Sequence, residues 1–600
     1  MSPGPKPQRE SGEPRKHVGS RLIGEKPMST DGCAQVFLAE AIKKAGITHL
    51  FGVPAAFTKA LNLADDSGVC VISAHSEAAA ACMADGYARA ARAIGLCYAQ
   101  NVGGAGLASG LRDAFLVGSP VIALTGGGDG ATAYKFAYQD SDDMRMFDAV
   151  TKLNISVRRV ERFPDLLRLA ARTATSGAPG PVHVEVEGAA GQLLDQHLPA
   201  EFWDLSAIAD HSAPCHRTPG EADAVSRAVD LVAGAQRPIL IAGGGARVSD
   251  AGPALLEFAR AFGAPIVTSM NAKGIIDERD PLACGVVGSY SRDSANRAVL
   301  DADVVIFAGS RAGGHVTNRW SLPAPSAKII QIDIDAQVMG RNFPTAVSIV
   351  GDVKTVLHQM LCAYKESGRP PRPAHADWLR VAAAYAEASR RKIETSGRTH
   401  RTPIRPEQLC TELNASLSDD CLLVADTGHA GWWTASLMDL KPSQSYLRAA
   451  GTLGWSLPAA IGAQCAFPAR KVVCFIGDGG FFYYLSELET AVRYELPVVF
   501  VVNNNSGFAQ EDALFHGGSG RPQEDPGRRF LEFAATDISG LARSFGCAGY
   551  CVERPQDLRE ILQEALHCGR PAVVEVLTDR SAVPAAAVGW PAPNGRQRPS

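Results

Sequence analysis

Two apolar segments near the end of the chain constrain its fold more than any other feature of the sequence. They are KVVCFI (471–476) and LPVVFVV (496–502), and the residues between them have the pattern of a helix from about Leu485 to Tyr494. Segments this apolar are typical of strands buried on both faces, and a helical connection joins two such strands in parallel. The sequence therefore predicts a βαβ unit in a parallel sheet.

The same alternation of apolar strands and helices runs through most of the chain and divides it into three units. A chain of 600 residues suffices for three domains of ordinary size. We predict an α/β fold with three doubly wound domains and mainly parallel sheets, spanning residues 31–195, 220–365 and 405–585. Linkers are predicted around 196–220 and from 366 to about 405. Residues 1–30 are rich in Pro, Gly and charge, which predicts a disordered tail.

Composition and charge exclude several classes of protein. The chain has 59 Lys and Arg against 63 Asp and Glu, so it carries no basic surplus for nucleic acid or an anionic membrane. No apolar run approaches the ~20 residues of a membrane-spanning helix. The 14 cysteines form no C-x-x-C motif, which is typical of buried free thiols in a reducing compartment. The N-terminal segment lacks the apolar centre of a signal peptide, so a cytoplasmic location is expected.

Polar residues follow both apolar segments of the βαβ unit. GDGG stands after the first and NNNSG after the second. Because the carboxyl ends of parallel strands meet at one sheet edge, Asp478 and Asn505 are expected to lie close together. The Asp478 carboxylate, the Asn505 amide oxygen and the Gly507 carbonyl are hard oxygen ligands suited to Mg²⁺. Glycines before a helix let backbone N–H groups approach phosphates, which predicts a diphosphate site at Gly477, Gly479 and Gly480.

The order of these motifs resembles a known family. GDG (477–479) and then NN (503–504), across one helix, is the pattern of thiamine diphosphate (ThDP) enzymes. The chain from about 31 to 580 resembles the acetolactate-synthase-like branch of that family. The resemblance implies a pyrimidine-binding, a middle and a diphosphate-binding domain, with ThDP and Mg²⁺ as cofactors. Further matching segments are HSEAAAACMADGYARA (75–90), GAPGPVHVEV (177–186), IQIDIDAQVMGRNF (330–343) and GWSLPAAIGA (454–463).

The resemblance also implies roles for individual residues. Glu77 would contact N1′ of the aminopyrimidine and so promote removal of the C2 proton of the thiazolium. Leu453 would support the bent cofactor. Gly428 and His429 would contact the diphosphate, although the chain has Gly-His-Ala where the family pattern resembles Gly-Gln-His. The alternative for Glu77 is a glutamate that only stabilises the N-terminus of its helix.

Glu511 is a further catalytic candidate. It lies six residues beyond Asn505, at the start of a segment that covers the thiazolium in the family it resembles. A carboxyl group at this place would act as a general acid towards the substrate. The alternative is that Glu511 and Asp512 cap a helix beginning at Ala513.

Together with the resemblance, these residues predict a ThDP- and Mg²⁺-dependent lyase or carboligase that cleaves or forms a C–C bond next to a carbonyl. Its substrates would be 2-oxo acids or 2-hydroxyacyl compounds, including CoA thioesters. The alternatives are an acetolactate synthase-type transferase, a flavoprotein oxidase of the same fold and a non-catalytic ThDP-fold binding protein. The resemblance also implies active sites shared between two chains, so a homodimer or a dimer of dimers (a homotetramer) is expected.

Several segments depart from the acetolactate synthase pattern and disfavour that enzyme itself. TGGGDG (125–130) lacks a glutamine, and SGFAQEDALFHGG (506–518) lacks the tryptophan that selects the second 2-oxo acid. GSYS (288–291) and GSRAGGH (309–315) replace the family's FAD contacts, so FAD is a doubtful cofactor. The arginines that could bind the phosphates of CoA form no cluster in the sequence: Arg311, Arg319, Arg341, Arg596 and Arg598.

Overall fold

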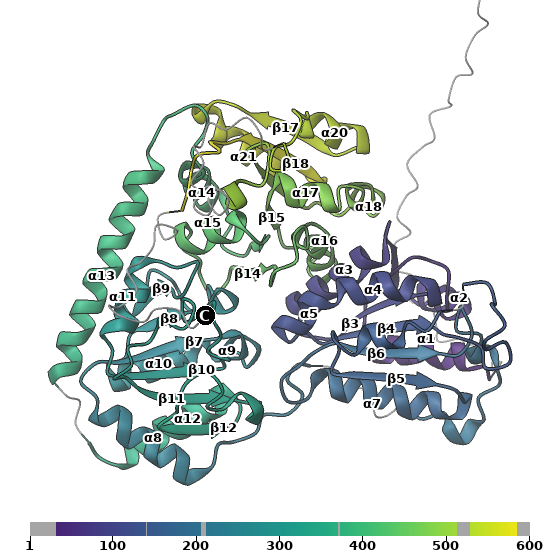
Figure 1. Ribbon diagram of the computed structural model, residues 1–600, viewed down its shortest axis with the longest axis horizontal. Helices are drawn as coiled ribbons and strands as arrows, with labels where there is room; N and C mark the ends of the chain where they lie inside the picture. The colour runs from purple at the N-terminus through teal and green to yellow at the C-terminus, as the bar shows by residue number, and fades with distance from the viewer. Residues whose placement is uncertain (1–31, 140, 206–211, 370–372, 513–528, 585–600) are drawn as a thin grey trace, which may run out of the picture.

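The structure is a computed structural model that describes residues 32–139, 141–205, 212–369, 373–512 and 529–584. Within these residues the chain forms three six-stranded sheets, and every pairing between strands is parallel. Figure 1 shows the three sheets with their flanking helices. The predicted fold of three doubly wound α/β domains is confirmed. The predicted tail, residues 1–30, lies outside the described residues.

The N-terminal domain has the strand order β2-β1-β3-β4-β6-β5. Its strands are β1 (His49–Gly52), β2 (Cys70–Ser73), β3 (Gly95–Ala99), β4 (Val121–Gly126), β5 (Leu153–Val157) and β6 (Val182–Val186). Its helices are α1 (Ala34–Lys44), α2 (Thr58–Asp66), α3 (Glu77–Ala91), α4 (Gly104–Gly110), α5 (Arg112–Val117), α6 (Met144–Phe147) and α7 (Phe163–Thr175). Strands β3, β4 and β6 are buried along their whole length, as expected of central strands in a parallel sheet.

The middle domain has the strand order β12-β11-β10-β7-β8-β9, so the direction of winding reverses between β7 and β10. Its strands are β7 (Pro238–Ala242), β8 (Ile266–Thr268), β9 (Ala283–Val286), β10 (Val304–Ala308), β11 (Lys328–Asp333) and β12 (Val347–Val350). Its helices are α8 (Ala222–Gly234), α9 (Gly244–Val248), α10 (Gly252–Phe262), α11 (Asp293–Asp301) and α12 (Val353–Glu366). A reversal of this kind leaves a crevice at the carboxyl ends of the two central strands.

The C-terminal domain repeats the strand order of the N-terminal domain, as β14-β13-β15-β16-β18-β17. Its strands are β13 (Leu422–Ala425), β14 (Ser445–Arg448), β15 (Val472–Gly477), β16 (Val499–Asn504), β17 (Ala548–Val552) and β18 (Ala572–Leu577). Its helices are α14 (Pro406–Ser416), α15 (His429–Leu437), α16 (Ser456–Ala466), α17 (Asp478–Tyr483), α18 (Glu487–Arg493), α20 (Ile538–Phe545) and α21 (Leu558–His567). The βαβ unit predicted from the two apolar segments is β15 and β16, which pair in parallel.

The predicted second linker contains a long helix, α13 (Pro373–Gly397). Figure 1 shows α13 running along the molecule from the middle domain to the C-terminal domain. It is anchored on the middle domain by Trp378, which is buried and donates from Nε1 to the carbonyl of Pro238 at 2.8 Å. No helix in the described part of the chain is long and apolar enough to cross a membrane.

Helices α3 and α16 cross where the N-terminal and C-terminal domains meet, as Figure 1 shows. Side chains of both domains belong to a single buried apolar cluster around this crossing. Two glycines allow the backbones to touch, because a Cβ at Gly86 would collide with Ala459 and a Cβ at Gly462 with Met83. The two domains are therefore joined by direct backbone packing.

Candidate active site

Asp478 lies at the carboxyl edge of the C-terminal sheet, where β15 ends and α17 begins. Its side chain is 2% exposed and accepts hydrogen bonds from the backbone N–H groups of Gly479 at 3.0 Å and Gly507 at 2.8 Å. Burial raises the pKa of this carboxyl to about 6. The sequence-predicted proximity of the GDGG and NNNSG segments is therefore observed at Asp478 and Gly507.

Asn505 has the free acceptor that a metal ligand needs. Its Oδ1 atom is buried and has no hydrogen-bond partner within the described residues. The preceding Asn504 is engaged differently, since its Nδ2 donates to the Glu575 carboxylate at 2.7 Å. A buried acceptor without a partner costs free energy unless a cation or water completes it. The carboxylate of Asp478 and the oxygen of Asn505 thus form a donor set that fits Mg²⁺.

The predicted phosphate-binding glycines lie at the N-terminus of α17. We expected the helix to begin only near Leu485, but α17 begins at Asp478 itself, so Gly477 is its N-cap and Gly479 and Gly480 are helical. A Cβ at Gly480 would collide with Asp426, and a Cβ at Gly479 would lie 2.7 Å from the ring of Phe508. At Gly477 nothing lies within 4 Å of a Cβ position. The space in front of the helix N-terminus is therefore open at Gly477, where an anion would be stabilised.

Asp426 is a buried carboxyl that the sequence analysis did not single out. It follows β13, accepts the backbone N–H of Gly454 at 2.9 Å through Oδ2, and leaves Oδ1 without a partner in the described structure. Burial raises its pKa to about 7. A carboxyl directly after the apolar strand LLVA could have been recognised in the sequence as a candidate site residue. Its contact with Gly454 could not, because that contact depends on the tertiary fold.

Gly428 and His429 form the N-terminus of α15. Gly428 has φ +68°, a conformation that glycine adopts without strain, and His429 is the first residue of the helix. Burial lowers the pKa of His429 to about 4, so the imidazole is neutral at pH 7. Its ring lies 6.0 Å from that of Trp433. A neutral ring at a helix N-terminus has one N–H group to offer an anion.

Leu453 is half-buried in the loop that joins β14 to α16. The next residue, Gly454, has φ +85° and is held by Asp426 through its backbone N–H. A Cβ at Gly454 would also lie 2.6 Å from Tyr483 of α17. The loop that carries Leu453 is thus packed against the helix that begins at Asp478.

Glu77 is the first residue of α3, directly after the N-cap Ser76, whose side chain accepts the backbone N–H of Ala79 at 3.2 Å. The Glu77 side chain is half-buried and lies against two glycines of the segment that follows β3. A Cβ at Gly103 would be 2.7 Å from Glu77 Oε1, and one at Gly106 would be 3.1 Å from its Cβ. The N-cap hydrogen bond of α3 is therefore made by Ser76 and not by Glu77.

Glu511 lies in a short helical segment, residues 509–512. The alternative in which Asp512 caps a helix beginning at Ala513 is wrong, because the chain is already helical before Asp512. Asp512 instead pairs with Arg580, whose Nε lies 2.8 Å from Asp512 Oδ2. Ala513 itself lies outside the described residues, as does the rest of the segment 506–518 after Asp512.

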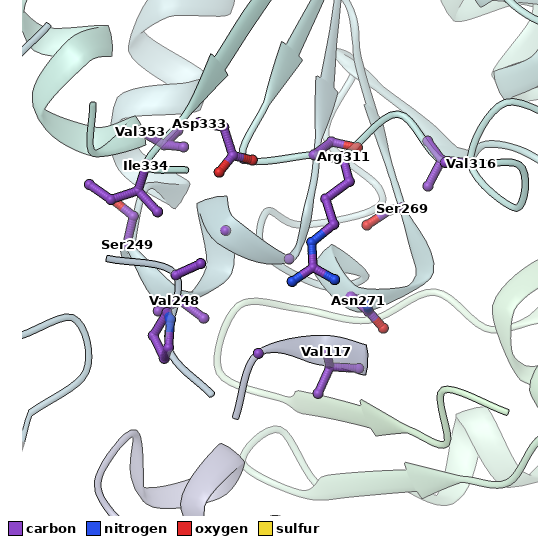
Figure 2. Close-up of a pocket in the computed structure, with 18 of the residues that line it drawn as sticks. Val117, Val248, Ser249, Ser269, Asn271, Arg311, Val316, Asp333, Ile334 and Val353 are labelled. Carbon is purple, nitrogen blue, oxygen red and sulfur yellow. The ribbon is translucent and has the colours of Figure 1, made fainter. Parts of the chain in front are cut away.

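A cavity of about 440 Å³ lies against the middle domain, at the carboxyl ends of β7 and β10 where the winding reverses. Figure 2 shows Arg311 extending towards Asn271 and Val117, with Asp333 on the opposite side of Arg311. Glycines at the start of α9 and after β10 line the same cavity. Its position, glycines and mixed charges suit a nucleotide-like group. Arg311 is the one predicted phosphate-binding arginine that lines it, and Arg596 and Arg598 lie outside the described residues.

Comparison with known proteins bears on all three domains. Family models for thiamine pyrophosphate enzymes match the chain at residues 34–146 (N-terminal TPP binding domain), 225–360 (central domain) and 426–576 (C-terminal TPP binding domain). A probable acetolactate synthase large subunit of Methanocaldococcus jannaschii is 32% identical over 574 residues, covering 93% of this chain and 94% of the relative. The chain belongs to the ThDP-dependent enzymes, in their acetolactate-synthase-like branch. It is therefore an enzyme that forms or cleaves a C–C bond, as predicted.

Other relatives in this ThDP family carry similar names. The large subunit of acetolactate synthase isozyme 2 of Escherichia coli is 30% identical over 556 residues, covering 90% of this chain and 95% of the relative. Acetolactate synthase of Mycobacterium bovis is 29% identical over 536 residues, covering 88% and 84%. These relatives favour the acetolactate synthase-type alternative over a 2-hydroxyacyl-CoA lyase. The sequence alone disfavoured an acetolactate synthase, because the glutamine and the tryptophan of that enzyme's pattern are absent from residues 125–130 and 506–518.

Proposed function

We propose that this ThDP enzyme is a carboligase, which joins the acyl unit of a 2-oxo acid to the carbonyl of a second molecule and releases CO₂. The observation that carries this proposal is the match to acetolactate synthase large subunits through all three domains. The segments at 125–130 and 506–518 differ from the acetolactate synthase pattern. We therefore leave the second substrate as a carbonyl compound of unspecified size.

The diphosphate end of the cofactor would be bound by the C-terminal domain. Asp478, with the free Oδ1 of Asn505 and the carbonyl of Gly507, would hold Mg²⁺ between the protein and the diphosphate. The open space at Gly477 and the N-terminus of α17 would receive the phosphates. His429, neutral and at the N-terminus of α15, would donate one hydrogen bond to them.

The reactive end would be controlled by three further residues. When bound, ThDP would supply the nucleophilic carbon and hold the electron pair that is left behind when CO₂ departs. Glu77 would hold a proton at N1′ of the aminopyrimidine, and Leu453 would keep the cofactor bent so that its two rings face each other. Glu511 would transfer a proton to or from the substrate oxygen.

Two chains would build each site. Glu77 lies in the N-terminal domain beside Gly103, and Asp478 lies in the C-terminal domain beside Gly507. As the family resemblance implies, a bent cofactor would lie between the N-terminal domain of one chain and the C-terminal domain of its partner. We propose a homodimer or a dimer of dimers as the active form.

The test is a substrate panel on protein loaded with ThDP and Mg²⁺. The purified chain is incubated with 2-oxo acids alone, with 2-oxo acids plus aldehydes, and with 2-hydroxyacyl-CoA thioesters, and the products are identified by mass. A carboligase gives CO₂ and a condensation product with two acyl units. Release of free aldehyde without condensation, or cleavage of the CoA thioesters alone, would replace this proposal by a lyase. The absorption spectrum of the same protein tests for FAD, which we do not expect.

A further inference from the structure

The loop from Ala449 to Gly454 carries Leu453, and the N-terminal domain holds its backbone directly. Asp113, on α5, accepts hydrogen bonds from the N–H groups of Ala450 and of Thr452, the second at 3.1 Å. The side chain of Asp113 is completely buried. One carboxylate thus binds two backbone groups of another domain, on the N-terminal side of Leu453.

A second carboxylate of the N-terminal domain holds the other side of the same loop. Asp85, on α3, accepts the indole N–H of Trp455 at 2.9 Å and is paired with Arg89. Arg89 lies 4.3 Å above the Trp455 ring and donates to the carbonyl of Arg448 at 2.8 Å. Asp85 is also completely buried, and burial raises its pKa.

Leu453 is therefore fixed from both directions along the chain. Thr452 is held by Asp113, Gly454 by Asp426 of the C-terminal domain, and Trp455 by Asp85. A carboxylate removed from water is costly unless good donors satisfy it. Two such groups act here across a domain boundary: Asp113 binds the loop backbone, and Asp85 binds the indole of Trp455 directly after the loop.

We propose that Asp113 and Asp85 are positioning residues, through which the N-terminal domain sets the cofactor-supporting loop of its own chain. This inference rests on the proposed role of Leu453. It also gives α3 two functions, because Glu77 begins this helix and Asp85 lies two turns further on, about 12 Å along its axis. In the proposed dimer, each N-terminal domain would serve one cofactor through Glu77 and the other through Asp85 and Asp113.

The first experiment is a double-mutant cycle between Asp113 and Leu453. Asp113→Asn keeps the shape of the side chain but replaces one acceptor by an NH₂ group that opposes the Thr452 N–H. Displacements of about 1 Å cost up to about 100-fold in rate, so we expect the rate of ThDP C2–H exchange to fall about 10- to 100-fold. ThDP affinity should change less than about 3-fold, because the diphosphate is bound elsewhere. In a Leu453→Ala background, Asp113→Asn should slow exchange less than about 2-fold further.

The matched control is Asp303→Asn. Asp303, in the middle domain, also accepts two backbone N–H groups, from Gln236 and Arg237, both at 2.8 Å. Its variant should exchange C2–H at the wild-type rate. Equal slowing in both variants, or independent effects of Asp113→Asn and Leu453→Ala, would overturn the proposal. If Asp113→Asn does not fold, Trp455→Phe removes the N–H bound by Asp85, together with part of the ring beneath Arg89, and enters the same cycle with Leu453→Ala.

The second experiment uses mixed dimers of Glu77→Gln and Asp113→Asn chains, made by co-expression with two tags. If Asp113 acts in its own chain and Glu77 in its partner, one site of each mixed dimer is intact and half of the bound ThDP exchanges at the wild-type rate. If Glu77 and Asp113 of one chain instead act on the same cofactor, each site of the mixed dimer carries one substitution. Neither site is then intact and the fast half is lost, which refutes the proposal. Because C2–H exchange needs no substrate, a wrong assignment of the carboligase reaction would leave both experiments readable.

Discussion

The clearest single perturbation of the Glu77 carboxyl is Gly103→Ala. Gly103 has φ −79°, which alanine adopts without strain, so the backbone need not change. The new methyl group would lie 2.7 Å from Glu77 Oε1 and 3.0 Å from its Cγ. Ordinary contacts begin at 3.4 Å, so the carboxyl must move by roughly 0.7 Å.

The size of the effect follows from that displacement. A reacting or positioning group displaced by about 1 Å costs up to about 100-fold in rate, so Gly103→Ala should lower kcat by about 10- to 100-fold. This corresponds to about 1.4 to 2.7 kcal/mol of transition-state stabilisation. The carboxyl end of Glu77 is flexible, but Ala99 Cβ on β3 also lies 3.0 Å from the new methyl group, so the thermal unfolding midpoint should fall modestly. The C2–H exchange rate and kcat are measured beside the affinity for ThDP and Mg²⁺.

Gly104→Ala is the matched control for Gly103→Ala. Its new methyl group would make ordinary contacts, 3.4 Å from Asp143 Oδ2, and Gly104 also has helical backbone angles. We expect it to exchange C2–H and turn over like the wild type. If Gly103→Ala matches Gly104→Ala in kcat while Glu77→Gln is inactive, the carboxyl tolerates this displacement and our reasoning fails. Equal losses in both alanine variants would indicate general damage to α4 and would refute it as well.

Three further predictions concern other parts of the molecule. Asp478→Ala should abolish retention of Mg²⁺ and ThDP in equilibrium dialysis, because it removes the only charged ligand of the proposed metal site; retention of both would refute that site. Glu511→Gln should lower kcat by roughly 100-fold with ThDP affinity preserved, whereas Asp512→Asn should mainly lower the unfolding midpoint; the opposite pattern would exclude Glu511 as the proton-transfer group. Burial lowers the pKa of His183 to about 3, so its neutral form stabilises the fold above pH 6.5 and this contribution is lost as pH falls towards 3. Between pH 7.5 and 5.5 the wild type should lose about 1.4 kcal/mol more stability than His183→Asn, and equal pH profiles would contradict the assignment.

The elements that local patterns specify were predicted well. The two apolar segments at 471–476 and 496–502 became β15 and β16, and the polar residues after them met at one sheet edge. Buried parallel strands need apolar side chains on both faces, so their signal is contained in a few consecutive residues. The start of α17 at Asp478 was missed, because glycines favour turns in isolation and form a helix here only with tertiary support.

Helix α13 shows a different limit of sequence reasoning. Its alanines, arginines and glutamates favour a helix, but the prolines and charges at its start indicated a linker. The burial of Trp378 against β7 is what ties the helix to the middle domain. Asp85 and Asp113 were missed for a related reason, since each binds groups more than 300 residues away in the sequence. Hydrogen bonds between distant segments leave no periodic signal in the sequence.

The same contacts explain how two domains can hold one rigid geometry. Gly86 and Gly462 bring the backbones of α3 and α16 together, so any sliding of one domain on the other would produce collisions. Asp113 adds hydrogen bonds from a buried side chain to backbone groups, which are shielded from salt in a way that surface ion pairs are not. The position of Leu453 therefore depends on contacts from the N-terminal domain as well as on its own sheet. A change at Asp85 or Arg89 of α3 should reach the cofactor loop through their contacts with Trp455 and the Arg448 carbonyl.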